Sequence, residues 1–340
     1  MIHIVLPEED TSVRTRLPFY LAAEEWVARC MPAGDYFFSW QVDPTVICGR
    51  NQEIDKEVNL EYCSEHGIDV VRRRSGGGCV FADRDNYMFS FITANDNVER
   101  VFAMYNNMIA DKLQELGFNA TVTGRNDICI EGKKVAGNAF YHLPGRSIAH
   151  GTMLYSFNPT MLANAITPSK AKLESKGVKS VPKRVTCLKD EGIRLTPSEF
   201  RDFIVEGLTM GNKYFVSPEE VSEIKKIEQH YYDPDFLRIH NDRMKSRKES
   251  GYVIHKEHIP GLGEFCVEYD VKGSTPGEIA NFTISGDFFM QKDVETLLCK
   301  PMNGTELLPE TVREKINGIN PQDIIDGLTE DLFYRLVIGE

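Results

Sequence analysis

The sequence predicts an α+β fold of mixed, largely antiparallel sheets flanked by helices, followed by a smaller α+β C-terminal domain. The first observation is that helical and strand-like patterns alternate without a regular βαβ period, which disfavours a doubly wound sheet. The second is the length of 340 residues, enough for roughly two domains. The third is a polar, charge-rich stretch at 234–250, typical of a linker. We therefore expect domains at 1–240 and 245–340.

The first elements are predicted from spacing and turn residues. Leu17–Cys30 has the apolar spacing of a short amphipathic helix. Phe37–Trp40 and Thr45–Cys48 are strand-like runs around a turn at Asp43–Pro44. Asp55–His66 is predicted as one helix, and a strand at 66–71 follows it.

The middle of the chain carries the strongest helical pattern. Apolar residues recur at intervals of three and four residues over Val98–Leu116, and Gly117 ends the pattern. A short helix is predicted later, at Asn158–Ile166. Between the two helices lie four strand-like runs, of which a tight EGKK turn joins the middle two: Ala120–Val122, Asp127–Ile130, Lys134–Tyr141 and Ile148–Phe157.

The remaining elements follow the same reasoning. Helical patterns occur at Pro197–Gly211 and Pro218–Tyr231, before the linker. The second domain is predicted to begin with a hairpin and to end with three helices. The hairpin strands are Gly263–Lys272 and Glu278–Ser285, and the helices are Lys292–Cys299, Thr305–Ile316 and Pro321–Val337.

Composition excludes several classes of protein. The formal net charge of −12 argues against a protein whose main function is to bind nucleic acid, because neutralisation of phosphate charge dominates such binding. None of the eight cysteines forms a CxxC pair, which argues against the usual zinc spacing and favours free thiols in a reducing compartment. The N-terminus resembles neither a secretory signal nor a transit peptide, and no apolar run approaches the roughly 20 residues of a membrane span. We therefore expect a cytoplasmic protein.

The segment RRRSGGG at Arg72–Gly78 is the most informative motif. Three glycines between strands weaken a sheet, but they let the backbone bend and let a ligand approach bare N–H groups. The neighbouring arginines supply positive charge for a carboxylate or phosphate. Taken alone, the motif fits either an anion-binding loop for a nucleotide or a glycine hairpin with arginines in solvent.

Lys134 opens a strand directly after the EGKK turn. Strict alternation would place Lys134, Ala136 and Asn138 on one face, with Gly137 on the other. A lysine there acts as a point charge on a phosphate or is simply exposed at a hairpin. Asn126 and Asp127 are candidates for turn formers or for the side chains that orient a hydrated magnesium ion.

Two further features remain open at this level. His150 stands before a glycine and an apolar strand, where a lone histidine is more often structural than catalytic. The segment Thr167–Asp190 holds seven basic residues in an acidic chain. It is either a solvated loop or a flexible loop that faces phosphate.

Five segments, taken in order, resemble the signature of lipoate–protein ligases of the biotin/lipoate ligase superfamily. They are RRRSGGGCVFAD, GRNDI, GKKVAGNAFY, AHGTMLYSF and SVPKRVTCL. The resemblance covers about residues 15–230, and the tail from about 245 is similar to the accessory domain of the long-form members. It implies a biotin/lipoate ligase-like catalytic domain, related to the catalytic domains of class II synthetases.

The resemblance also implies roles for individual residues. Arg73 would contact the nucleotide, and Lys134 would touch both the lipoyl carboxylate and the α-phosphate as the catalytic residue. The backbone from Gly78 through Cys79 and Val80 to Phe81 would lie against ATP. Arg73, Gly77, Lys134 and His150 would bind lipoate.

A metal-side motif and a mobile loop complete the implied site. Asn126, Asp127 and Gly137 fall on the metal and phosphate side, with Asp127 as a ligand of Mg²⁺. Lys183 and Arg184 belong to a loop that closes over the adenylate. The chain departs from many members at Ala82, where they have His, and at Cys79, where they have a small apolar residue.

The implied activity is ATP-dependent. Lipoate is converted to lipoyl-AMP with release of pyrophosphate, and the lipoyl group then passes to an acceptor lysine. The implied acceptors are lipoyl domains of 2-oxoacid dehydrogenase E2 subunits or the glycine cleavage H protein. Three alternatives remain: an octanoyl or lipoyl transferase that uses Cys79 or Cys187 without ATP, a biotin ligase, and a non-catalytic lipoate-binding module.

Overall fold

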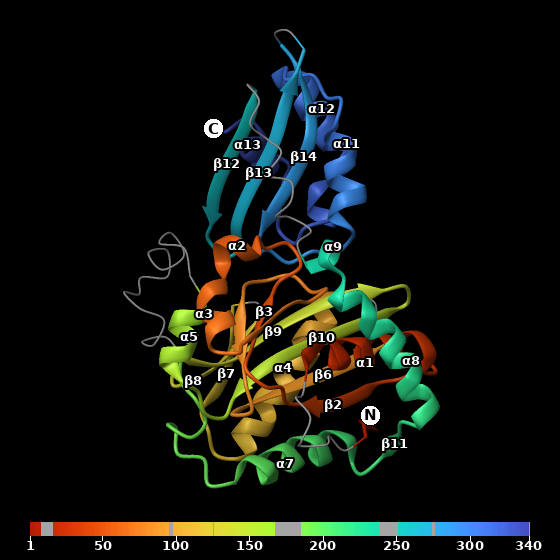
Figure 1. The fold of residues 1–340 in the computed structure, drawn as a ribbon, viewed down its shortest axis with the longest axis vertical. Coiled ribbons are helices and arrows are strands. Elements are labelled where there is room, and N and C mark those ends of the chain that lie inside the picture. Colours follow the sequence, from red (N-terminus) through yellow and green to blue (C-terminus); the bar gives the residue numbers. More distant parts are fainter. Residues whose placement is uncertain are drawn as a thin grey trace.

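The computed structural model describes residues 1–7, 16–94, 98–124, 126–166, 185–237, 251–273 and 276–339. Two groups of elements lie one above the other along the longest axis of the molecule (Figure 1). The larger group ends with α9 (Pro234–Leu237), and the smaller begins with β12 (Tyr252–Ile259). Both mix helices with largely antiparallel strands, which confirms the predicted α+β class.

An eight-stranded sheet forms the centre of the larger domain, in the order β11-β1-β2-β6-β10-β9-β8-β7. β1 pairs in parallel with β11 and β2, and all other pairs in this sheet are antiparallel. The short strands β1 and β11, which lie next to each other at one end of the sheet, were not predicted. The bounds are β1 Ile2–Val5, β2 Tyr36–Trp40, β6 Asn86–Thr93, β7 Ala120–Thr123, β8 Asp127–Ile130, β9 Lys133–Leu143, β10 Arg146–Leu154 and β11 Lys213–Phe215.

Helices cover both faces of this sheet. α1 (Leu17–Cys30) and α8 (Pro218–Glu228) pack on one face around Trp26, Phe38 and Ile224. α4 (Val98–Glu115) and α7 (Pro197–Thr209) pack on the other face. Both α7 and α8 begin with a proline behind a complete capping box, which satisfies donors that a helix start leaves unpaired.

A second, three-stranded sheet carries the glycine-rich motif. Its order is β4-β3-β5, with β3 at Thr45–Cys48, β4 at Asp69–Arg72 and β5 at Val80–Ala82. The predicted helix at 55–66 is wrong, because Val58 forms a β-bridge with Ile166 and splits the segment into two short helices. The helices beside this sheet are α2 Ile54–Glu57, α3 Leu60–Glu65 and α5 Pro159–Ala165.

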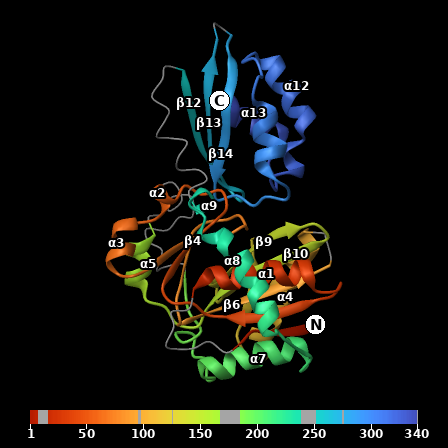
Figure 2. The ribbon, with the colours of Figure 1, turned by 45° about the vertical axis from the view of Figure 1, so that its right-hand side comes forward.

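The smaller domain is a three-stranded antiparallel sheet with helices on one face (Figure 2). Its hairpin of β13 (Gly263–Lys272) and β14 (Glu278–Gly286) was predicted, whereas β12 was missed. A core that includes Phe265, Phe282 and Phe333 holds sheet and helices together. The remaining elements of the smaller domain are a π-helix at Glu295–Cys299, α11 Lys300–Met302, α12 Pro309–Ile319, a 3₁₀ turn at Pro321–Asp323 and α13 Glu330–Ile338. A further 3₁₀ turn, at Gln229–Tyr232, belongs to the larger domain.

Within the described ranges, no helix is long and apolar enough to cross a membrane.

Candidate active site

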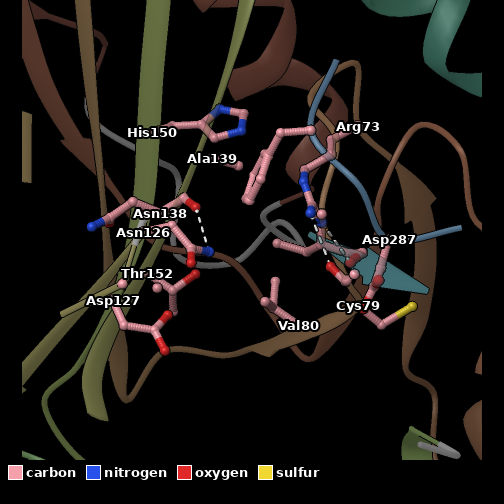
Figure 3. Close-up of a pocket in the computed structure, with 18 of the residues that line it drawn as sticks. Arg73, Cys79, Val80, Asn126, Asp127, Asn138, Ala139, His150, Thr152 and Asp287 are labelled. Carbon is pink, nitrogen blue, oxygen red and sulfur yellow. Dashed lines mark hydrogen bonds between the residues drawn. The ribbon is translucent and has the colours of Figure 1, made fainter. Parts of the chain in front are cut away.

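Arg73 shapes the glycine-rich loop from inside. Its Nε donates to Ser75 Oγ at 2.8 Å, and its Nη2 donates to the carbonyl oxygens of Gly76 and Gly78 at 2.6 and 2.9 Å. Its Nη1 reaches the Ile47 carbonyl on β3 at 3.0 Å. The guanidinium therefore holds the loop in a fixed curve while its edge lines the pocket (Figure 3). The preceding Arg72 is fully buried and binds four backbone carbonyls, which gives it a structural role.

The smaller domain contacts the same loop. The Gly77 N–H donates to the Phe288 carbonyl at 3.1 Å. A Cβ at position 76 would lie 2.3 Å from that carbonyl oxygen, so only glycine fits there. Phe289 continues inward and stacks on Phe140 with ring centroids 5.8 Å apart. Two of the three glycines in the motif therefore serve a domain contact, a role that their sequence context did not reveal.

A buried chain of polar contacts, called here the Glu24–His150–Ser75 relay, connects α1 to the glycine-rich loop. Nδ1 of His150 on β10 lies 3.0 Å from both oxygens of the Glu24 carboxylate, which can accept from it, and its Nε2 lies 2.7 Å from Ser75 Oγ. Glu24 and Ser75 are completely buried, and His150 is 6% exposed. Because both ring nitrogens have partners, the relay fixes the imidazole at the pocket wall.

Lys134 lies in the pocket beside a carboxylate. Its Nζ is 2.6 Å from Asp127 Oδ1, and both residues line the cavity. The predicted alternation is wrong here: the pairing of β8 with β9 shifts between Ile128 and Cys129, so Lys134 pairs with Cys129. As a result the Lys134 side chain lies directly over Gly137, where an added Cβ would meet Nζ at 2.6 Å.

Hydrogen bonds of Asn126 connect the start of β8 to β9. Its side chain donates to the Asn138 carbonyl at 3.1 Å, and its carbonyl accepts from the Asn138 N–H at 2.9 Å. Asn138 in turn donates to Asn106 of α4 at 2.7 Å. These bonds set the position of Asp127, the next residue in the strand, at the pocket wall (Figure 3).

One cavity of about 880 Å³ collects most of the predicted site residues. It is lined by Arg73, Gly77, Gly78, Cys79, Val80, Asn126, Asp127, Lys134, Gly137 and His150. Phe81 is instead buried in the core of the small sheet. Lys183 and Arg184 lie outside the described residues.

The cavity has two kinds of wall. Around Lys134 it is polar, whereas aliphatic and aromatic side chains from the helix α1 and four strands line an apolar part: Leu17, Leu21, Trp40, Ile47, Val80 and Met88. The smaller domain contributes residues that sequence reasoning missed: His258, Pro260, Gly261, Leu262, Gly263, Asp287 and Phe289. No motif marked them, because their position follows from the packing of the two domains.

The cysteines of this region are poor candidates for a nucleophile. Cys79 Sγ lies 3.5 Å from Cys48 Sγ. This hydrogen bond, together with burial, holds the pKa of the Cys79 thiol well above its ordinary value. Burial also raises the pKa of Cys187. Both thiols are therefore protonated near neutral pH, whereas the thiolate is the reactive form.

Comparison with known proteins agrees with this geometry. The model of the lipoyl protein ligase A/B catalytic domain matches residues 17–209, and that of the bacterial lipoate protein ligase C-terminus matches 252–337. Lipoate–protein ligase 1 of Staphylococcus aureus is 35% identical over 288 residues, covering 82% of this chain and 83% of the relative.

Two solved structures share the fold. That of LipL1 from P. falciparum in complex with lipoate covers 100% of this chain and 99% of its own, with a TM-score of 0.79 at 19% identity. That of lipoate–protein ligase A bound with ATP covers 70% of this chain and 97% of its own, with a TM-score of 0.58 at 22% identity. The chain thus belongs to the lipoate–protein ligase family, as its five sequence segments indicated.

Proposed function

We propose that this cavity joins lipoate to ATP and then delivers the lipoyl group to a lysine of a lipoyl-domain protein. The observation that carries the proposal is that one cavity combines Lys134 and the glycine-rich loop with an apolar wall. A fatty acid needs the apolar wall for its chain and a cation for its carboxylate. The adenylate intermediate needs both at once.

A free carboxylate is a poor acylating agent, so lipoate must be activated before it can be transferred. A lipoate carboxylate oxygen attacks the α-phosphorus of ATP, the bond to the β-phosphate oxygen breaks, and pyrophosphate leaves. Negative charge builds up on the α-phosphate oxygens during this step. The Lys134 ammonium, held by Asp127 at 2.6 Å, is positioned to stabilise that charge without reorganisation.

The second step uses the mixed anhydride. The neutral ε-amine of the acceptor lysine attacks the lipoyl carbonyl carbon, the bond to the phosphate oxygen breaks, and AMP leaves. The buried Glu24–His150–Ser75 relay keeps one wall rigid during both steps. Exclusion of water protects the anhydride from hydrolysis.

A magnesium ion fits the polar part of this cavity. Mg²⁺ needs only one or two carboxylates when phosphate oxygens and water complete its shell. Asp127 supplies such a carboxylate at the wall, and the ion would neutralise part of the phosphate charge. ATP dependence and eight free cysteines make the cytoplasm the compartment that we propose.

Acceptor proteins of this class are lipoyl domains of 2-oxoacid dehydrogenase E2 subunits and the glycine cleavage H protein. The test is transfer to an unlipoylated lipoyl domain, followed by mass spectrometry of the acceptor. With lipoate, ATP and Mg²⁺ the acceptor should gain one lipoyl group, and omission of ATP should abolish the gain. Transfer from an octanoyl thioester without ATP would instead support the transferase alternative.

A further inference from the structure

The two domains also meet at a polar patch formed by β13, β14 and the start of α2. Cys266 and Glu268 are two residues apart on β13, so they point to the same face of the sheet. Their neighbours Phe265 and Val267 point into the core of the smaller domain. Glu53 of the larger domain, the residue that precedes α2, lies against this patch and accepts from Ser285 Oγ at 3.2 Å. Figure 1 shows α2 directly beneath the strands.

Three potential metal ligands converge in this patch. One carboxylate oxygen each of Glu53 and Glu268 and the sulfur of Cys266 all lie within 4.8 Å of one another. The three residues are buried, with exposures of 8%, 4% and 8%. Such a grouping draws on both domains and lies outside the set of residues that line the lipoate cavity.

The carboxylates in the patch are unequally partnered. Lys56 Nζ lies 2.5 Å from Glu53 Oε2, and Lys256, which pairs with Cys266 across the sheet, is a second ammonium near the two carboxylates. Glu268 Oε1 is enclosed, and the described residues offer it no hydrogen-bond partner. A buried carboxylate oxygen without a partner is costly. The same carboxylate supplies an oxygen within 4.8 Å of the other two ligands, so a bound cation would stabilise a group that is now incompletely partnered.

We propose that Glu53, Cys266 and Glu268 bind a divalent cation of the zinc class across the domain interface. Zinc accepts sulfur and carboxylate oxygen together and is stable with three protein ligands and a water. Magnesium and calcium are disfavoured because they take oxygen ligands. On binding, the Cys266 thiol releases its proton to solvent and the thiolate takes the metal. The ion fastens the smaller domain to the larger one.

Cobalt(II) tests the site by a spectroscopic signal that depends on the thiolate. The full-length protein, freed of metal by a chelating resin, is titrated with Co²⁺. One equivalent should produce a sulfur-to-cobalt charge-transfer band in the near ultraviolet, and Zn²⁺ should displace it. Because the readout does not involve catalysis, its result is independent of the proposed ligase activity.

Three variants make the assignment specific. Cys266→Ser should remove the band, and Glu268→Gln should weaken Co²⁺ binding roughly tenfold or more. Cys30→Ser, at an exposed thiol, should leave the band unchanged. Absence of the band in the wild-type protein, or its persistence in Cys266→Ser, would overturn the proposal. A circular dichroism spectrum identical to that of the wild type confirms that each variant is folded.

Discussion

Replacing Lys134 with alanine is expected to remove most adenylate formation while the protein keeps its fold. The Lys134 Nζ lies 2.6 Å from Asp127 Oδ1 and lines the cavity. Removing one preorganised group that stabilises transition-state charge typically lowers the rate by about 10²–10³, or about 2.7–4 kcal/mol. The fall should appear in kcat/KM for lipoate-dependent AMP formation.

The same substitution should barely affect stability. The Lys134 side chain is 29% exposed, and an ion pair with this much solvent contact contributes about 0.2–1 kcal/mol. Thermal unfolding of the variant should therefore stay within a few degrees of the wild type. The contrast between the two magnitudes separates a chemical role from a structural one.

Lys133 provides the matched control. It is the preceding residue on β9, its side chain is 54% exposed, and its Nζ lies 3.5 Å from Glu191. Lys133→Ala also removes one positive charge, but not from the cavity wall, so its activity should remain near normal. The reasoning is refuted if Lys134→Ala retains more than about a tenth of the wild-type kcat/KM, or if Lys133→Ala loses as much.

Two further substitutions test neighbouring features. Cys79→Ser should keep most activity, because the thiol is held protonated beside Cys48; loss of transfer together with an octanoyl thioester on the wild-type enzyme would favour the transferase instead. Gly76→Ala should loosen the domain contact, because its Cβ would lie 2.3 Å from the Phe288 carbonyl oxygen. Small-angle scattering should then report a larger radius of gyration, whereas Gly318→Ala, with no atom within 4 Å of the added Cβ, should not; equal radii in all three proteins would contradict the expectation.

Local patterns predicted most of the elements, because their signals lie within a few residues. The helix α4 carries an unbroken apolar spacing, and the β8–β9 hairpin is marked by a turn in which Glu131 and Gly132 both have positive φ. At the failed helix prediction over 55–66, a distant residue decided the outcome. Val58 breaks a helical stretch by pairing with Ile166, a contact that no local pattern encodes.

The residues of the site also divide into those that local sequence patterns predicted and those that depend on distant contacts. The motif residues that line the cavity were identified by type and order, and the face taken by Lys134 was wrong because a register shift interrupts β9. The hydrogen bond of Arg73 to the Ile47 carbonyl and the wall formed by Asp287 and Phe289 depend on packing between segments far apart in sequence. Such contacts follow from the assembled fold and not from any single segment.

Carboxylate-dependent exchange between ATP and labelled pyrophosphate tests the central claim most directly. The assay reports formation of the acyl-adenylate without any acceptor, and it should be run with lipoate, octanoate and biotin in parallel. Lipoate should drive exchange and biotin should not, because the cavity offers an apolar wall beside Lys134. Exchange that proceeds equally with biotin, or that does not occur with lipoate in the presence of ATP and Mg²⁺, would contradict the account.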